Sequence, residues 1–400
     1  MSWEKVALGK VCSIVNGGTP KSGITEYWDG NLNWITPKEM GKLESRNISN
    51  TERKITDKGL KNSSAKLLPI NSVILSSRAP IGHLAINTEP MATNQGCKGL
   101  IPSDKLYYEY LYYFLRHSKQ LLNDMGSGAT FKELSGSKLA TVEIPLPSFS
   151  IQKAVVKKLD AIFEEINEAS LATEANINNS EALFQSYLTE IFETNAENWE
   201  TKNLIQLANE DCTLSYGIVQ PGDDYENGLP IVRPTNLTQK YISKFELKTI
   251  NPVLADSYKR TTLTGNELLL CVRGTTGTVA ISTEELKGCN VTRGIVPIRF
   301  KANEVNLDYA YYLFNSSVIQ KQIKSKTYGA ALLQINIADI KKLQVKVPPL
   351  DEQMTLVHKL NSLQEVIANL KKLQSTKLEN LLHFKKSILQ QAFNGELIRE

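Results

Sequence analysis

Two stretches of the chain, 151–194 and 352–394, place apolar residues at alternating spacings of four and three with no proline between them. This repeat is typical of a helix that packs against another helix along a narrow stripe. Polar residues, Thr173 among them, interrupt the first stripe near its middle. The pattern therefore predicts two long helices. The expected packing positions are Val155, Leu159, Ile162 and Ile166 in the first helix, and Leu360, Leu363, Ile367 and Leu370 in the second.

The chain also repeats itself, and the two helical stretches belong to the repeat. Nine residues from Pro147 to Phe192 recur 201 positions further on, from Pro348 to Phe393, without a gap. The segments that precede them correspond more loosely, because their spacing drifts between the copies. The order is therefore a variable module, a helix, a second variable module and a second helix.

Charge indicates which helix pairs with which. Residues 151–194 hold three Lys and eight acidic residues, whereas residues 352–394 hold six Lys and three Glu. Opposite net charge favours packing of the two helices against each other. Since the first helix leads to the second module and the second helix leaves it, the pair is expected to be antiparallel. A helix of 44 residues spans about 66 Å.

The modules mix short β-rich runs with loops and shorter helices. Strands are expected at 73–75, 84–86, 268–271 and 295–298, and helices at 107–122 and 309–323. The fold class is then α+β: two β-rich mixed domains joined by two long antiparallel coiled-coil helices, with a pseudo-twofold internal repeat. The expected segments are a first domain at 1–148, a first helical spacer at 149–196, a second domain at 197–349 and a second spacer at 350–400.

Composition indicates the class of protein and its cellular compartment. Hydrophobic residues make up 41% of the 400 residues and charged residues 22%, as in ordinary globular proteins. No apolar run is long enough to span a membrane and no secretory signal is expected. Five scattered cysteines without a CxxC pair favour reduced thiols in a cytoplasm. The modules carry 18 Lys and Arg each against 13 and 14 acidic residues, which modestly favours a phosphate-bearing partner.

Catalytic motifs are incomplete. Gly17-Gly18-Thr19-Pro20-Lys21 is similar to a phosphate-binding loop, but Pro20 lacks the amide donor that such a loop uses. Val347-Pro348-Pro349-Leu350 lacks the polar and aromatic ends of an amino-methyltransferase motif. Neither copy of the repeat keeps an acid–base set in register, so the chain is expected not to be catalytic by itself.

Several short motifs, in this order and duplicated, carry a resemblance that extends over nearly the whole chain. The chain resembles the specificity (S) subunit of Type I restriction–modification systems. The residues concerned are Gly17-Gly18-Thr19-Pro20, Tyr27-Trp28, Trp34-Ile35-Thr36-Pro37, Arg78 to Gly82 and Thr93-Asn94-Gln95-Gly96 in the first module, Tyr216 to Gly222 and Pro230 to Asn236 in the second, and Ala392 to Leu397 at the end.

The resemblance implies two target-recognition domains that each read one half of a bipartite site in double-stranded DNA. It also implies two methyltransferase subunits on the helical spacers, and restriction/translocase subunits that join this core, in the cytoplasm of a bacterium or archaeon. S-adenosylmethionine, ATP and Mg would belong to those partners, with no cofactor or metal in this chain and no membrane contact.

Comparing the modules sorts the candidate DNA-binding residues. Arg78 and Arg273 occupy matching places, so phosphate contact and buried structural pairing both stay open for them. Residues that differ at matching places are better candidates for reading bases, since Arg and Lys can reach guanine and Asn and Gln can pair with adenine; each could equally be an ordinary polar loop residue. They are Lys21, Ser22, Lys38, Asn94, Gln95 and Lys98 in the first module, and Gln220, Arg233, Thr235, Asn236, Thr292 and Arg293 in the second.

Two other functions remain as alternatives. A stand-alone DNA-modifying enzyme would transfer methyl groups or cut DNA without a partner. A coiled-coil scaffold whose modules bind proteins would show no salt-dependent binding to duplex DNA.

Overall fold

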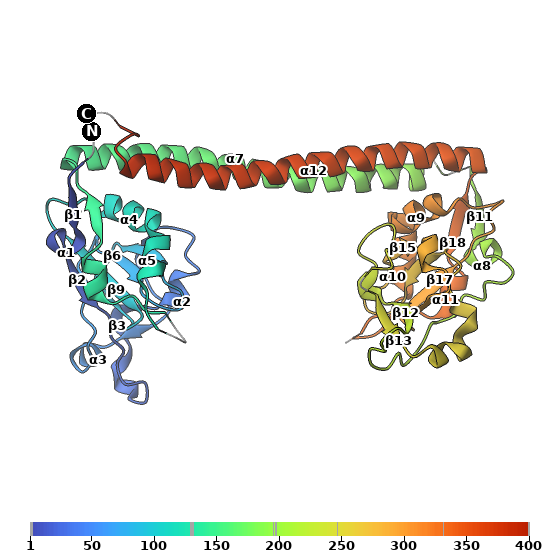
Figure 1. Cartoon of the computed structure of the whole chain (residues 1–400), viewed down its shortest axis with the longest axis horizontal. Helices are drawn as coiled ribbons and strands as arrows, with labels where there is room; N and C mark the ends of the chain where they lie inside the picture. The colour runs from blue at the N-terminus through green and yellow to red at the C-terminus, as the bar shows by residue number, and fades with distance from the viewer. Residues whose placement is uncertain are drawn as a thin grey trace. The chain divides into compact units, whose positions relative to one another are not determined.

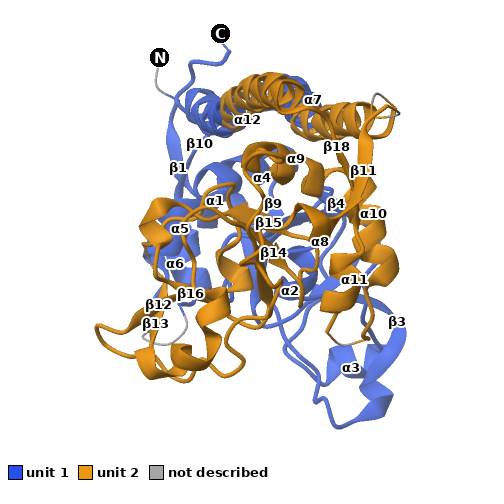
Figure 2. Ribbon diagram, turned by 90° about the vertical axis from the view of Figure 1, so that its right-hand side faces the viewer, with its two compact units in different colours: residues 1–173, 376–400 blue, residues 174–375 orange. Residues whose placement is uncertain are grey.

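The chain divides into two compact units, each with a β-rich module and parts of both long helices (Figure 2). The computed structural model describes residues 3–128, 132–194, 196, 198–245, 247–330 and 332–398. The first unit comprises Met1–Thr173 with Thr376–Glu400, and the second comprises Glu174–Ser375. This division cuts through both long helices, whereas the four segments expected from the sequence end where the helices end; those segments stay a prediction.

The long helices are α7 (Phe149–Thr189), which continues as a π-helical turn over Glu190–Thr194, and α12 (Leu350–Phe393). The other elements of the first unit are shown in Figure 1. They are β1 (Lys5–Ala7), α1 (Leu8–Val11), β2 (Cys12–Asn16), η1 (Thr25–Tyr27), β3 (Trp28–Ile35), α2 (Pro37–Met40), β4 (Asn47–Ile48), β5 (Lys54–Ile55), α3 (Asp57–Lys61), β6 (Val73–Ser76), β7 (Leu84–Asn87), β8 (Met91–Thr93), β9 (Cys97–Pro102), α4 (Tyr108–His117), α5 (Lys119–Met125), α6 (Gly136–Ala140) and β10 (Glu143–Pro145).

The second unit follows the same order with shorter strands and more 3₁₀ turns. Its elements are β11 (Glu200–Asn203), α8 (Leu204–Leu207), β12 (Leu229–Val232), η3 (Pro234–Asn236), β13 (Lys248–Ile250), η4 (Pro252–Thr261), β14 (Leu268–Cys271), β15 (Val279–Ile281), η5 (Glu284–Leu286), β16 (Asn290–Val291), β17 (Ile295–Ile298), α9 (Leu307–Asn315), α10 (Ser317–Lys326), α11 (Ile337–Lys341) and β18 (Gln344–Val347).

Each module contains three sheets, and one of them is a two-stranded antiparallel pair, β1-β10 in the first module and β11-β18 in the second. The first module has a five-stranded sheet in the order β2-β9-β6-β7-β4 and a three-stranded sheet in the order β5-β3-β8. The second has β15-β14-β17 and β13-β12-β16. In the sheets β5-β3-β8 and β13-β12-β16 the central strand pairs with one neighbour in parallel, β3 with β8 and β12 with β16. The four strands expected from the sequence are present, which confirms the duplicated β-rich module.

The helices expected at 107–122 and 309–323 are each divided in two. The first divides at Ser118, whose backbone leaves the helical region without becoming extended, and the second divides at Ser316, whose backbone is extended. Both serines are buried, and the Ser316 hydroxyl donates to the carbonyl of Leu313 at 2.6 Å. A serine hydroxyl that bonds a nearby backbone carbonyl competes with helical pairing, which accounts for the break at Ser316.

The expected antiparallel pairing of the long helices is confirmed within each unit. In the first unit the Lys385 ammonium donates to the Asn167 side chain, and in the second Lys371 pairs with Glu181. In the first unit the Lys158 ammonium also donates to the carbonyl of Leu397 at 3.0 Å, so the partner's number falls from Leu397 to Lys385 as the number on α7 rises from Lys158 to Asn167. In the part of the chain that the structure describes, no helix is both long and apolar enough to cross a membrane.

Seven of the eight expected packing residues lie in the helix interfaces or the adjoining cores. Val155, Leu159, Ile166, Leu360 and Ile367 are buried, and Ile162 and Leu363 are partly buried. The prediction that Leu370 packs in the helix interface is wrong, because its side chain is 41% exposed. Its neighbour Lys371 takes the inward position, where the ion pair with Glu181 turns it toward the other helix. The four–three repeat is therefore present at this turn of α12, but Lys371 rather than Leu370 faces the other helix.

A buried glutamine fastens each long helix to its module. The Gln152 side chain accepts a hydrogen bond from the Tyr107 amide at 2.8 Å and donates to the carbonyls of Lys105 and Pro147, both at 2.9 Å. Gln353 does the same with Asn306, Glu304 and Pro348, each at 2.8 Å. Both glutamines are fully buried with oxygen and nitrogen bonded. Buried polar groups that are fully paired hold one geometry, so each helix begins at a defined point of its module.

A second polar contact joins each module to the side of its helix. In the first unit Arg46 pairs with Glu109 at 2.8 Å and with Asp160 of α7 at 2.5 Å. The hydrogen bond to Asp160 raises the pKa of the Arg46 guanidinium above its ordinary value. The second unit has Lys240, which pairs with Asp308 at 2.7 Å and donates to Asn361 of α12 at 3.0 Å. The same place in both modules therefore presents a cation to the helix.

We expect Gln152→Leu to lower the free energy of unfolding by about 1–3 kcal/mol, because it leaves one buried amide and two buried carbonyls without partners. Urea denaturation measures this, with Gln390→Leu, an exposed position on α12, as the control. Equal effects of the two substitutions would show that the buried glutamine does not fasten the helix.

Candidate nucleic-acid interface

The candidate residues of the first module gather where the parallel strands β3 and β8 end. Ile35 and Thr93 are the last paired residues of these strands, and the Asn94 amide donates to the carbonyl of Ile35 at 2.9 Å. Parallel strands have their carboxyl ends at the same edge, so the chain leaves both strands at one place. Lys38 follows β3 in α2, and Asn94 and Gln95 follow β8 directly.

The loop after β2 lies against the same edge. The Gly18 amide donates to the carbonyl of Thr93 at 2.9 Å, and the Trp34 indole donates to the carbonyl of Gly18 at 2.9 Å. The Thr19 hydroxyl bonds the side chains of Asn94 and Gln95. A Cβ on Gly17 would lie 1.9 Å from the Asn94 carbonyl oxygen, so only glycine permits this approach.

Arg78 comes from a fourth segment. The Ser77 amide donates to the carbonyl of Gly96 at 2.7 Å, which brings the end of β6 to the turn after β8. A Cβ on Gly96 would lie 3.0 Å from the Pro37 ring and 3.3 Å from the Arg78 Cγ, so these three residues are packed together. The side chain of Arg78 is about one third exposed. One edge of the first module thus collects amide and cationic groups from four segments.

The second module builds the same edge from different side chains. The Thr292 amide donates to the carbonyl of Val232 at 2.9 Å, as Asn94 does to Ile35. The Val272 amide donates to the carbonyl of Gly294 at 2.8 Å and brings in Arg273. A Cβ on Gly217 would meet the carbonyl oxygen of Val291 at 2.0 Å, as at Gly17. We call these two places the strand-end surfaces. They comprise Thr19, Lys38, Arg78, Asn94 and Gln95 in the first module, and Arg233, Thr235, Asn236, Arg273 and Arg293 in the second.

The candidates differ in exposure. Lys98 and Thr292 are buried, at 6% and 8% exposure, and lie beneath the surface rather than on it. Lys21, Ser22 and Gln220 lie further out on the loops that cross the edge, and the Lys21 carbonyl accepts a hydrogen bond from the Trp28 indole at 3.3 Å. The exposed candidates are Lys21, Ser22, Lys38, Gln95, Gln220 and Thr235, and the half-buried ones are Arg78, Asn94, Arg233, Asn236, Arg273 and Arg293.

Arg233 combines a fixed backbone with an incompletely paired side chain. Its amide donates to the Asn236 side chain at 2.8 Å, which holds the turn that follows β12. Its Nε is buried and has no hydrogen-bond partner among the described residues. A buried donor without a partner costs free energy, so the Arg233 side chain is less firmly held than the turn on which it lies.

Two features of the first strand-end surface are not predicted by the sequence pattern. Glu133, on the segment before α6, lies 3.5 Å from Arg78 and 3.7 Å from Lys98. The Arg53 guanidinium stacks on Trp28, with its carbon 3.9 Å from the ring centroid, so Arg53 has a structural role in the first module. The repeat could have drawn attention to Glu133, because the matching position of the second copy, 334, holds the uncharged residue Gln.

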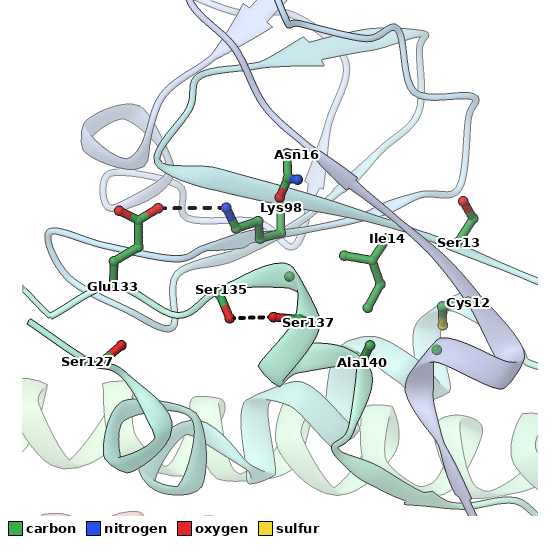
Figure 3. A pocket seen from close by; sticks show the side chains of 12 residues that line it. Cys12, Ser13, Ile14, Asn16, Lys98, Ser127, Glu133, Ser135, Ser137 and Ala140 are labelled. Atoms are coloured by element: carbon green, nitrogen blue, oxygen red, sulfur yellow. Dashed lines mark hydrogen bonds and ion pairs between the residues drawn. The ribbon is translucent and has the colours of Figure 1, made fainter.

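A pocket of about 960 Å³ opens beside the first surface, and Lys98, Glu133, Ser127 and Asn16 are among its lining residues (Figure 3). Cys97 lies under the same edge, and burial raises the pKa of its thiol to about 12, so the thiol is protonated at neutral pH. Burial also raises the pKa of Cys271 in the second module. Because a nucleophilic cysteine must be a thiolate, both surfaces offer hydrogen bonds and positive charge rather than a reactive thiol.

Comparison with known proteins gives one consistent result. The family model described as the Type I restriction modification DNA specificity domain matches residues 1–179 and again 188–380. The chain is 29% identical to the Type I restriction enzyme MjaIX specificity subunit of Methanocaldococcus jannaschii, over 95% of this chain and 92% of the relative. It is 24% identical to the EcoBI specificity subunit of Escherichia coli, over 78% of this chain and 70% of the relative.

Two solved structures share the fold. A chain from a study of complex assembly and conformational transition in the Type I R-M system aligns with a TM-score of 0.73 at 19% identity, over 99% of this chain and 98% of the other. The HsdS subunit from Thermoanaerobacter tengcongensis aligns with a TM-score of 0.61 at 18% identity, over 99% and 97%. The α+β class with duplicated modules and long helices is thereby confirmed.

We expect Gly17→Ala to lower the free energy of unfolding by about 1–3 kcal/mol, because the added methyl group meets the Asn94 backbone and must displace the loop from the edge. Gly23→Ala, in the same loop, is the matched control, since nothing lies within 4 Å of a Cβ at that position. Thermal and urea unfolding measure both variants. A Gly17→Ala protein as stable as Gly23→Ala would refute the close approach.

Proposed function

The chain belongs to the family of Type I restriction–modification DNA specificity domains, and we propose that it recognises an asymmetric, bipartite site in double-stranded DNA with one module for each half. A single observation carries the proposal. The same strand-end surface is built twice, by the same backbone contacts, with different side chains. A common scaffold with unlike polar groups suits the reading of two unlike sequences.

The roles of individual residues follow from what the two surfaces share. Arg78 and Arg273 occupy equivalent places and would contact phosphates, which carry no sequence information. The residues that differ at matching places, such as Gln95 against Arg293 and Thr36 against Arg233, would read base edges in the major groove. Lys98 and Thr292 are buried and are left out of this assignment.

The long helices would serve as the spacer. Two binding modules on one connected support add their binding free energies when the half-sites match the distance between them. Helix α12 contains 44 residues, which corresponds to about 66 Å. A turn of DNA measures about 34–36 Å, so a spacer of this length suits half-sites one to two turns apart.

Exposed apolar residues at equivalent places support the docking of two copies of one partner. Leu183 on α7 and Phe384 on α12 lie 201 positions apart in the repeat, and they are 62% and 47% exposed. Each lies on a helix surface of its own unit. We assign them to two methyltransferase subunits, with restriction/translocase subunits joining the complex in the cytoplasm. This chain would be non-catalytic, and S-adenosylmethionine, ATP and Mg would act on those partners.

The direct test of the proposed function is methylome sequencing of a host with and without this chain. We expect one bipartite motif to lose its methylation when the chain is removed. Methyl transfer or cleavage by the purified chain alone would instead favour a stand-alone enzyme. Lack of salt-dependent binding to duplex DNA would favour the protein scaffold.

Arg233→Ala should relax the base preference in one half-site only, at a cost of about 1–3 kcal/mol in discrimination at the base pair that it contacts. Selection of binding sites from a randomised duplex pool measures this. If the selected motif is unchanged in both halves, Arg233 does not read a base.

Leu183→Asp and Phe384→Asp should each remove one methyltransferase subunit from the assembly, since a carboxylate replaces an apolar anchor worth about 2 kcal/mol or more. Native mass spectrometry of the co-expressed complex gives the stoichiometry. Leu171→Asp is the control, because Leu171 is 67% exposed but its counterpart in the repeat is Lys372. Retention of both partner copies in either variant would contradict this docking surface.

A further inference from the structure

The two strand-end surfaces differ in one charged position beneath their shared arginine. In each module the segment that follows the second short helix pairs with the arginine after the central strand, as the bridges between residues 78 and 133 and between residues 273 and 334 show. The first module has Glu133 at this position and the second has Gln334. The backbone is therefore the same while the charge differs.

Glu133 contacts two cations with different oxygens. Its Oε2 lies 3.5 Å from the Arg78 guanidinium and its Oε1 lies 3.7 Å from the Lys98 ammonium. Figure 3 shows the Glu133 carboxylate directed toward Lys98 at the pocket. The side chains of Arg78 and Glu133 are 35% and 41% exposed, whereas that of Lys98 is 8% exposed. The outer half of this cluster is thus open to an incoming anion and the inner half is not.

In the second module, neutral residues replace both charged residues that lie beside the arginine of the first module. β9 and β17 occupy the same place beside the central strand, and their registers put Val296 where the first module has Lys98. Gln334 replaces the carboxylate. Among the described residues, Arg273 has no carboxylate within salt-bridge distance. The two modules therefore present the same cation, once paired with a carboxylate and once beside neutral neighbours.

We propose that Glu133 is a built-in competitor of DNA phosphate for Arg78, so that the first module makes a weaker phosphate contact than the second. This rests on the proposed function, because the competing anion is the DNA backbone. On binding, the phosphate replaces Oε2 as the partner of Arg78, while Oε1 stays with the buried Lys98. Glu133 thereby determines the difference in DNA affinity between the two modules. Because the phosphate contact of the first module is weaker, binding to the first half-site depends more on base contacts.

The proposal predicts a coupling between Glu133 and Arg78 that a structural role would not produce. We expect Glu133→Gln to tighten binding to a labelled duplex by up to about tenfold at roughly 0.1 M salt, and to steepen the salt dependence by about 0.9, because each phosphate contact releases close to one counterion. Arg78→Ala should then weaken binding more in the Glu133→Gln background than in the wild type. Fluorescence anisotropy with the complete chain, across a salt series, measures all four proteins of the cycle.

The second module provides the reciprocal experiment. Gln334→Glu should weaken binding and flatten its salt dependence, and Arg273→Ala should then cost less than it does in the wild type. Glu143→Gln, an exposed carboxylate on β10, changes net charge equally and is the control for Glu133→Gln. Lys98→Val with Glu133→Gln copies the second module's pair and keeps the net charge of the chain, so it guards against misfolding caused by an unpaired buried lysine.

The outcomes distinguish a failure of the proposed function from a failure of the role assigned to Glu133. Duplex binding by the wild-type chain that does not depend on salt would end both the proposed function and the role of Glu133. Salt-dependent wild-type binding with Glu133→Gln equal to Glu143→Gln, or an equal cost of Arg78→Ala in both backgrounds, would overturn only the role of Glu133. The role of Glu133 would also be overturned if the Lys98→Val, Glu133→Gln protein bound DNA with the affinity of the wild type. Glu133 would then only neutralise the buried Lys98.

Discussion

The arrangement depends first on a buried amide at the start of each long helix. Gln152 and Gln353 each join three backbone groups of the preceding module to the first turn of the helix, without access of water. A module attached by a flexible linker would have no defined direction, and its polar edge would face a duplex only by chance. The buried hydrogen bonds, together with the cation that each module presents to the helix side, remove that freedom.

The second constraint is the parallel pairing of two short strands in each module. Parallel strands end at one edge, so segments far apart in the sequence meet there with their polar groups outward. Glycines at positions 17 and 217 let the crossing loop lie directly on the backbone of this edge. The scaffold is then independent of the side chains that follow each strand, which can differ between modules without a change of fold. Duplication with divergence is the result expected of a protein that reads two unlike half-sites.

Much of this organisation was predictable from the sequence, because it rests on periodicity and repetition. The four–three spacing predicted both helices, and their opposite charge with the connectivity predicted the antiparallel pairing. Leu370 was assigned to the interface wrongly because periodicity cannot distinguish it from Lys371, whose long side chain reaches Glu181. The burial of Lys98 and its pairing with Glu133 were not predictable either, since they depend on contacts between segments far apart in the chain. The role of Gln152 was missed although the repeat contained it, because a conserved pattern does not state which backbone groups a side chain bonds.

The central claim is that each module carries the recognition of one half-site on a common scaffold. It is tested most directly by a chain in which a second copy of the first module replaces the second module, followed by methylome sequencing of the host. The account predicts a methylated motif whose two halves are the same sequence on opposite strands. A motif that stays asymmetric, with the original second half intact, would contradict it.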